Sequence, residues 1–238
     1  MAIPFAQPPK IVVFTGPGLS GESGFAPFDP ATMPAGIALE DVVTHDGFDR
    51  DPAGVFDFYN RRRRELHTVK PNLAHQGLAA LDLTGPGEVL VVTRNIDDLH
   101  ERAGSQAVLH TNGELLKARC LICTKVSDRV DDITEASACP ICGNAGQLRP
   151  HVVWVGEEPL RIATVYEALA HCRLFLVIGV AGGSEPARSF LADARRAGAR
   201  TVEFPGGFSA AAEPFDERIA GPLAETVPEW VKRVIAER

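Results

Sequence analysis

Hydrophobic residues along the chain gather in short continuous runs rather than in alternating patterns. Four runs rich in Val, Ile, Leu or Phe are KIVVFTG, EVLVVTRN, RLFLVIGV and TVEFPGG, at residues 10–16, 88–95, 173–180 and 201–207. Parallel strands that are covered on both faces have this appearance. Helical patterns separate the runs at residues 74–83, 161–172 and 185–198. The alternation predicts an α/β fold with a Rossmann-type doubly wound parallel sheet, which binds ligands beyond the carboxyl ends of its strands.

Two segments interrupt this alternation. Residues 24–75 are rich in Pro and Phe and then become helical around VFDFYNRRRREL, and residues 114–150 contain four of the five cysteines. We therefore interpret residues 1–238 as one domain with two inserts, a helical module at 25–75 and a small zinc-binding domain at 112–150. The large Rossmann-type part then comprises residues 10–24, 76–111 and 151–238.

The clustered cysteines form two C-x-x-C pairs. Cys120 and Cys123 lie in CLIC, Cys139 and Cys142 lie in CPIC, and fifteen residues separate the two pairs. This spacing is typical of a structural zinc ribbon, and four thiolates leave no open position for a catalytic water. The alternative is four unliganded thiols in a small insert. Cys172 lies in a helical pattern, where we expect a small core residue.

Bulk composition narrows the possible partners. The net charge of −7 argues against a general binder of nucleic acid or of anionic membranes, because both need basic surface. The N-terminal residues do not have the pattern of a secretory signal, and no apolar run approaches the ~20 residues that cross a bilayer. With cysteines spaced for a metal rather than for disulfides, the sequence predicts a cytoplasmic protein.

A glycine-rich loop, TGPGLSGESGFAPFDP, follows the first predicted strand and can bring backbone amides to a phosphate. This loop, TRNIDDLHERAGS, the cysteine pairs and LRPHVVWVGEEP come in an order that resembles the sirtuins, the NAD-dependent protein-lysine deacylases. GFDRDPAGVFDFYNRRRRELH and NGELLKARC resemble the bacterial class III branch, which removes acetyl and acidic acyl groups. The resemblance implies NAD and an acyl-lysine protein substrate in a cleft between the two domains, besides a structural Zn²⁺.

The resemblance also assigns roles to individual residues of this chain. It implies cofactor contacts at Gly16, Gly18, Ser20, Phe28, Arg94, Asn95, Asp97 and Gly179. It implies substrate contacts at Tyr59, Arg62, Val153 and Gly156. A phenol and a guanidinium, such as those of Tyr59 and Arg62, can hold the carboxylate of an acidic acyl ligand. We expect the rest of the arginine run to be a solvated helix face.

The chain departs from the sirtuin pattern at the catalytic base. The bacterial branch reads His-x-His-Gly-Glu-Leu-Leu before the first zinc cysteine, with the second histidine as the base, whereas this chain reads HTNGELL. Asn112 therefore stands at the base position, and His110 falls on the noncatalytic histidine. An amide does not accept a proton at neutral pH, so Asn112 cannot act as the base. Asn95 and Asp97 are the other residues of the expected catalytic set.

Other departures from the sirtuin pattern also face the cofactor or the acyl tunnel. They are Pro17, Asp29, Arg94, Val155, Val180, Ala181 and Pro205. We expect Asp29 and Arg94 to pair across the cleft. The changes favour a rebuilt cleft that serves another reaction or ligand, in which a histidine restored at position 112 alone recovers little activity. The alternatives are an NAD-dependent deacetylase or desuccinylase of low activity and a noncatalytic scaffold protein.

Overall fold

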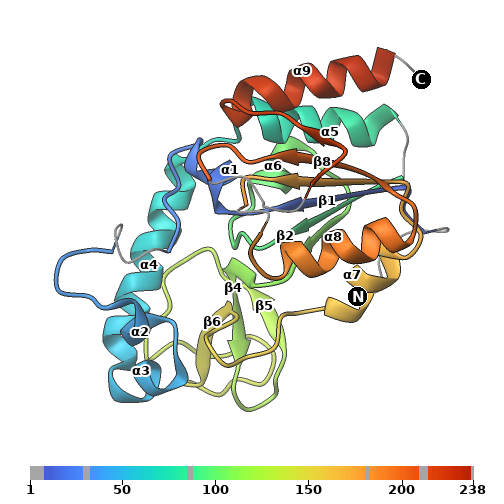
Figure 1. The fold of residues 1–238 in the computed structure, drawn as a ribbon. Coiled ribbons are helices and arrows are strands. Elements are labelled where there is room, and N and C mark those ends of the chain that lie inside the picture. The colour runs from blue at the N-terminus through green and yellow to red at the C-terminus, as the bar shows by residue number, and fades with distance from the viewer. Residues whose placement is uncertain (1–7, 29–32, 85–87, 181–182, 209–213, 237–238) are drawn as a thin grey trace.

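The computed structural model describes residues 8–28, 33–84, 88–180, 183–208 and 214–236. Within these ranges the larger part is a parallel sheet in the order β3-β2-β1-β7-β8-β9 (Figure 1). Its strands are β1 (Ile11–Thr15), β2 (Val89–Thr93), β3 (Val108–His110), β7 (Leu174–Ile178), β8 (Arg200–Phe204) and β9 (Glu217–Arg218). Four of them coincide with the predicted apolar runs, whereas β3 and β9 are too short to form such runs.

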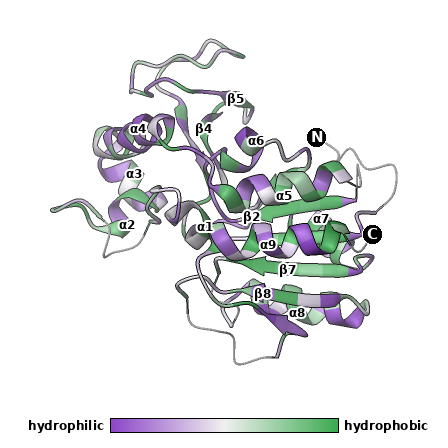
Figure 2. Cartoon of the chain, turned by 90° about the horizontal axis from the view of Figure 1, so that it is seen from above, coloured by the Kyte–Doolittle hydropathy of each residue, from purple (hydrophilic) through white to green (hydrophobic). Residues whose placement is uncertain are grey.

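Helices cover both faces of this sheet (Figure 1). They are α5 (Leu73–Thr84) and α9 (Leu223–Ala236) on one face, and α7 (Ile162–Leu169) and α8 (Ala187–Arg196) on the other. Along β1, Ile11 and Val13 pack into the core under α5 and α9, while Val12 and Phe14 pack under α7 and α8. Figure 2 shows β2 and β7 in green between helices of mixed colour, because both faces of these strands are buried. The doubly wound fold is thus confirmed.

The predicted helical module contains α2 (Leu39–Val42), α3 (His45–Arg50) and α4 (Pro52–Thr68). The long helix α4 begins where the sequence favours a start. Asp51 accepts a hydrogen bond from the Gly54 amide at 2.9 Å, and Pro52 occupies the first helical position, where no amide hydrogen is needed. Phe58 and Tyr59 on α4 pack into a core that also includes Leu115 and Trp154 from beyond the module.

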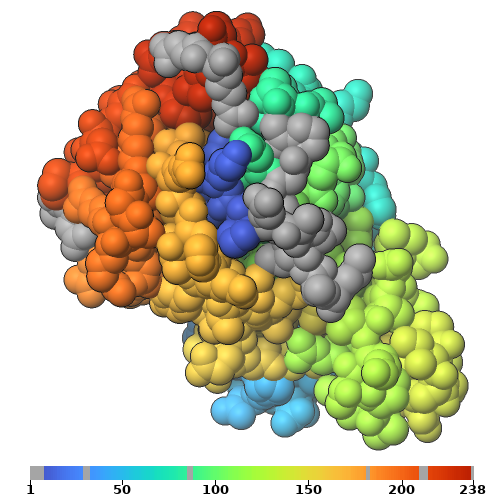
Figure 3. All heavy atoms as spheres, turned by 90° about the vertical axis from the view of Figure 1, so that its right-hand side faces the viewer, coloured from blue at the N-terminus to red at the C-terminus, as the bar shows by residue number. Residues whose placement is uncertain are grey.

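The small domain contains an antiparallel sheet in the order β5-β4-β6. Its strands are β4 (Gly113–Cys120), β5 (Val126–Asp128) and β6 (Leu148–Val152), and its yellow-green residues form a projecting lobe in Figure 3. The pairing of β4 with β6 shifts register between Gly113 and Ala118. No helix that the structure describes is long and apolar enough to cross a membrane.

Arg63 corrects the expectation for the arginine run. Its side chain is fully buried, whereas Arg61 and Arg64 are exposed. Its guanidinium donates to the Leu115 carbonyl at 2.9 Å and to Asn60 Oδ1 at 2.7 Å. Because the pairing of β4 with β6 shifts register around Leu115, the Leu115 carbonyl accepts its hydrogen bond from Arg63 on helix α4. Arg63 therefore joins the helical module to the small domain.

Candidate active site

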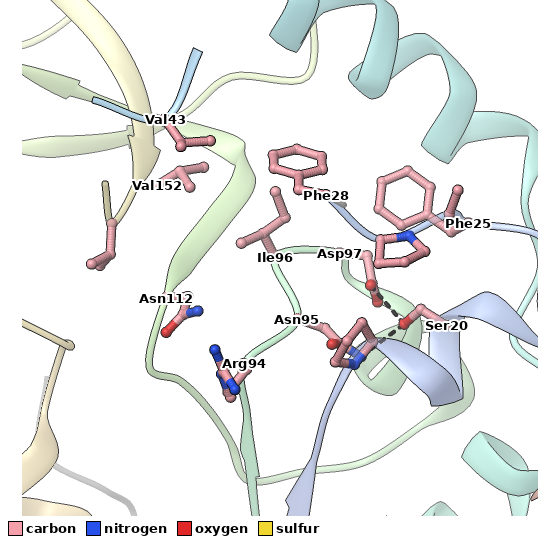
Figure 4. A pocket seen from close by; sticks show the side chains of 14 residues that line it. Ser20, Phe25, Phe28, Val43, Arg94, Asn95, Ile96, Asp97, Asn112 and Val152 are labelled. Carbon is pink, nitrogen blue, oxygen red and sulfur yellow. Dashed lines mark hydrogen bonds between the residues drawn. The ribbon is translucent and has the colours of Figure 1, made fainter. Parts of the chain in front are cut away.

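A pocket of about 220 Å³ lies at the carboxyl ends of β1 and β2, as the fold class predicts (Figure 4). One wall holds Ser20, on the short helix α1 (Pro17–Gly21), together with Asn95 and Asp97, which follow β2. The opposite wall brings Val152 and Val153 from the end of β6. Phe25, Phe28 and Ile96 add apolar surface, so a few polar groups converge in a largely apolar hollow, as in many ligand sites.

Hydrogen bonds fix the polar side chains of the first wall. The Ser20 hydroxyl donates to the Asp97 carboxylate at 2.7 Å, and the Asn95 amide donates to Ser20 Oγ at 2.8 Å and to the Gly16 carbonyl at 3.0 Å. Burial raises the pKa of Asp97, although the bonds from Ser20 and the Leu99 amide act in the opposite direction. Three buried groups from two strand ends thus form one preorganised polar cluster.

Asn112 lies in the same pocket, where its side chain and that of Arg94 lie apart from the Ser20 cluster (Figure 4). The Thr111 hydroxyl donates to Asn112 Oδ1 at 3.3 Å. Gly113 is the next residue, and its backbone, at φ 86°, turns the chain into β4. The residue expected at the base position therefore reaches the pocket, as an amide.

His110 lines a different, neighbouring pocket. Its ring nitrogens lie 2.8 Å from the Asn95 carbonyl and 2.8 Å from the Glu101 carboxylate. Burial disfavours the charged ring, but the bond to Glu101 and its charge outweigh this and raise the pKa of His110. The histidine is held by two acceptors outside the pocket that contains Asn112.

Three glycines let the loops after β1 and β7 touch. A Cβ on Gly16 would lie 2.5 Å from Val180 Cγ2, one on Gly18 would lie 2.6 Å from the Phe208 ring, and Gly179 has φ 62°. The amides of Gly16 and Gly18 donate to the carbonyls of Ile178 and Gly179 at 3.1 and 3.0 Å. These glycines shape the edge of the sheet without lining the pocket, and their contacts with a cofactor remain a prediction.

The four clustered cysteines converge. Their sulfur atoms all lie within 4.8 Å of one another, with 3.7 Å between Cys120 and Cys142 and 3.8 Å between Cys123 and Cys139. Ligands about 2.3 Å from a tetrahedral zinc ion are separated by about 3.8 Å, so the donor set fits structural zinc. Gly143, at φ 77°, makes the turn after the second pair. Cys172 is buried in the main core, as expected.

Comparison with known proteins identifies the family. The model of the Sir2 family matches residues 16–186. The NAD-dependent protein deacylase of Vibrio cholerae is 41% identical over 99% of this chain and 96% of its own length, and that of Escherichia coli K12 is 43% identical over 96% and 83%. The chain belongs to the Sir2 family.

Solved structures of Sir2 proteins have a fold similar to that of this sirtuin over most of its length. A Sir2 homologue in complex with NAD has a TM-score of 0.84 at 29% identity, covering 95% of this chain and 89% of its own. A histidine-to-asparagine mutant of a Sir2 homologue in complex with ADP-ribose has a TM-score of 0.82 at 28% identity, covering 95% and 92%. A Sir2 protein bound to acetylated peptide has a TM-score of 0.75 at 26% identity, covering 95% and 92%.

Tyr59 and Arg62 lie beside the pocket of this sirtuin rather than in its lining. The Tyr59 hydroxyl accepts a hydrogen bond from Trp154 Nε1 at 3.1 Å, and burial raises the pKa of Tyr59. Arg62 donates to Glu65 and to the Ala26 carbonyl, and its guanidinium lies over the Phe25 ring at 4.1 Å. It lines an adjacent pocket of about 330 Å³. Recognition of an acidic acyl group by this pair remains a prediction.

The altered positions of this sirtuin have different structural roles. Pro17 is the first residue of α1, where the missing amide hydrogen costs the helix nothing. Val180 is buried against Gly16, and Pro205 does not line the pocket. Val155 is exposed, and Gly156 makes a turn at φ 90° outside the pocket lining. Asp29 and Ala181 lie outside the described residues, and so does the expected pairing of Asp29 with Arg94.

The sequence analysis did not predict the partners that hold residues 152–157 in place. Arg149 donates to both oxygens of Glu157, at 2.7 and 3.0 Å, and lies 3.6 Å from the centre of the Trp154 ring. Although burial opposes it, this pairing and the bond from the Trp154 amide lower the pKa of Glu157 to about 2. The only sign of this contact in the sequence is that Arg149 and Glu157 lie on either side of VVW at residues 152–154.

Proposed function

We propose that this sirtuin is an NAD-dependent protein-lysine deacylase of low activity. The observation that carries the proposal is the hydrogen-bonded cluster of Asn95, Ser20 and Asp97, retained in a chain that is 41% and 43% identical to proteins named NAD-dependent protein deacylases. Relatives of the same fold in complex with NAD and with acetylated peptide support both ligand classes. The comparisons thus favour the deacylase alternative over a repurposed cleft.

The residues of the pocket fit a ligand that carries an amide and a ribose. Asn95 and Asp97 offer polar groups whose orientation is already fixed by Ser20, so little conformational entropy is lost when they hold an amide. Phe25 and Phe28 provide apolar walls that exclude water. When bound, NAD would supply the ribosyl carbon that bonds to the acyl oxygen, with nicotinamide as the leaving group.

Asn112 explains why we expect a low rate. A base within the pocket removes a proton from a ribose hydroxyl in the sirtuin reaction, and such proton transfer contributes ~10²–10⁴-fold. The Asn112 amide can orient a hydroxyl by a hydrogen bond, but it cannot take its proton. His110 is in another pocket, so no histidine that the structure describes lines this one.

A second candidate function is a cleft adapted to another ligand or reaction. It is favoured by Asn112 and Arg94, which both line the pocket and both differ from the sirtuin pattern. In that case a histidine at position 112 recovers little activity, because other cofactor contacts have also changed. The two candidates therefore differ in their response to one substitution.

The test measures NAD-dependent removal of acetyl and succinyl groups from lysine peptides by mass spectrometry. We expect slow turnover by the parent protein and an increase of about 10²–10⁴-fold in kcat for Asn112→His. Asn112→Gln is the matched control, because it keeps an amide and should bring no gain. If neither the parent nor Asn112→His forms a deacylated product that depends on NAD, the deacylase proposal is wrong and the adapted cleft is favoured.

A further inference from the structure

Arg94 is a cation inside the candidate pocket without a partner among the residues that the structure describes. Its guanidinium lines the pocket, and no hydrogen bond or ion pair joins its side chain to the described protein. Two other arginines nearby differ, because Arg62 donates to Glu65 and Arg149 donates to Glu157. Burial lowers the pKa of Arg94, and no carboxylate offsets this effect.

This arrangement costs free energy in the unliganded protein. A guanidinium remains protonated in proteins, so it cannot relieve its desolvation by losing a proton. Arg94 is half-buried, and a charge that is partly withdrawn from water normally has a counter-ion or several hydrogen bonds. Arg94 has neither from the described residues. An anionic oxygen of a ligand would restore both, since arginine binds carboxylates and phosphates with two parallel hydrogen bonds.

The surroundings of Arg94 define where such an anion binds. Figure 4 shows its side chain directed toward Asn112, whose amide nitrogen can donate to the same oxygen. The Asp97 carboxylate lies with Ser20 in the other cluster and is engaged by the Ser20 hydroxyl at 2.7 Å. The space beside Arg94 and Asn112 is thus the part of the pocket where donors prevail.

We propose that Arg94, with Asn112 beside it, forms an anion subsite that binds a phosphate or carboxylate group of the ligand. The inference rests on the proposed function, because it takes this pocket to be the site of the nucleotide and the acyl chain. The anion can come from the pyrophosphate of the nucleotide or from the terminal carboxylate of an acidic acyl group. Arg94 determines specificity in either case, whereas Arg62 is already engaged by Glu65 and the Ala26 carbonyl.

The experiment measures binding by calorimetry, with ADP-ribose in one arm and succinyl-lysine and acetyl-lysine peptides in the other. The variants are Arg94→Gln, which removes the charge, and Arg94→Lys, which keeps the charge without the planar fork. Arg173→Gln is the matched control, since Arg173 is an exposed arginine next to the amino end of β7, on the opposite edge of the sheet. A thermal scan of each unliganded protein shows whether the substitution disturbs the fold.

Loss of a charged hydrogen bond predicts binding about 10- to 100-fold weaker in Arg94→Gln, with a smaller loss in Arg94→Lys and none in Arg173→Gln. Weaker ADP-ribose binding identifies the pyrophosphate as the source of the anion. Loss of a preference for succinyl over acetyl peptide identifies the carboxylate. Because Arg94 has no partner among the residues that the structure describes, its replacement by Gln should leave the unfolding temperature of the unliganded protein unchanged or higher.

Three outcomes overturn the subsite. They are equal binding of both ligand classes by Arg94→Gln and the parent, failure of the parent to bind either class, and a lower unfolding temperature for Arg94→Gln that accounts for its weaker binding. Because the measurement does not depend on turnover, it separates the two proposals. A protein that binds through Arg94 but never deacylates contradicts the proposed function alone. A deacylase whose KM values are unaffected by Arg94→Gln contradicts the subsite alone.

Discussion

Replacement of Arg63 by methionine tests whether a buried guanidinium on α4 supports the shifted part of β4. Met keeps an unbranched chain that fills much of the same space, but it cannot donate to the Leu115 carbonyl. Asn60 Oδ1 keeps a donor in the Ile133 amide at 2.9 Å, so the Leu115 carbonyl is the acceptor that loses its protein partner. The perturbation is therefore close to the loss of one buried hydrogen bond.

The expected loss of stability follows from the loss of this one hydrogen bond. A buried acceptor left without a partner costs about 1–3 kcal/mol of the free energy of unfolding. Burial of the Arg63 guanidinium, which lowers its pKa to about 10, is itself unfavourable and offsets part of this loss in the variant. We expect Arg63→Met to lower the free energy of unfolding by about 1–2 kcal/mol. That corresponds to about 2–8 °C in the unfolding temperature of a chain of this size.

Arg64→Met is the matched control for this measurement. Arg64 is the next residue on α4 and pairs with Asp132 at 2.6 Å, but both side chains are about half exposed, at 54% and 48%. Exposed ion pairs contribute about 0–1 kcal/mol, so this variant should lose less. Denaturant unfolding gives both values, and hydrogen exchange of residues 113–120 shows where Arg63→Met acts. Equal stability of Arg63→Met and the parent, or an equal loss in both variants, would refute the reasoning.

Two further predictions concern zinc and pH. Removal of the metal by a chelator, or Cys120→Ala, should raise hydrogen exchange in the small domain more than in the parallel sheet, because the binding energy of the metal stabilises the fold locally. Protein that is purified without chelator and contains no zinc would contradict the site. Burial lowers the pKa of His75 to about 4, and burial with the charge of Arg119 lowers that of His151 to about 4. The unfolded chain takes up these protons below a pH of about 6.5, so the stability that these two histidines contribute is lost as the pH falls from about 6.5 to about 4, by up to about 1.4 kcal/mol per unit for each. Denaturant titrations of His75→Gln against the parent check the slope, which should be smaller in the variant.

The elements that could be predicted from sequence are those whose signal is local. The runs that became β1, β2, β7 and β8 are continuous apolar stretches because both faces of each strand are covered, and this pattern needs no partner to be recognised. The zinc site was equally accessible, since two residues between cysteines suffice to turn both thiolates toward one ion. The resemblance to sirtuins implied a site at Asn95 and Asp97, and both residues line one pocket beyond the carboxyl end of β2.

The features that could not be predicted depend on pairs far apart in the chain. Arg63 and Arg64 belong to the same run of four arginines, and only the register shift in β4 leaves the Leu115 carbonyl as an acceptor for Arg63. The Tyr59 hydroxyl accepts a hydrogen bond from Trp154, 95 residues away in the sequence, and nothing in the sequence around Tyr59 indicates this bond. Long-range partners decide whether a polar residue faces a ligand or stabilises the fold.

The same distinction separates His110 from Asn112. The two residues are two positions apart in the sequence. His110 ends β3, where its ring is held between the Asn95 carbonyl and Glu101, while Asn112 precedes Gly113 at the start of β4. A Cβ on Gly113 would lie 2.1 Å from the His151 carbonyl, so packing against β6 fixes the turn that directs Asn112 into the pocket. To replace the missing base, the His110 ring would have to leave two acceptors and enter the pocket that Asn112 lines. The loss of a base at position 112 is therefore not repaired by the histidine two residues earlier.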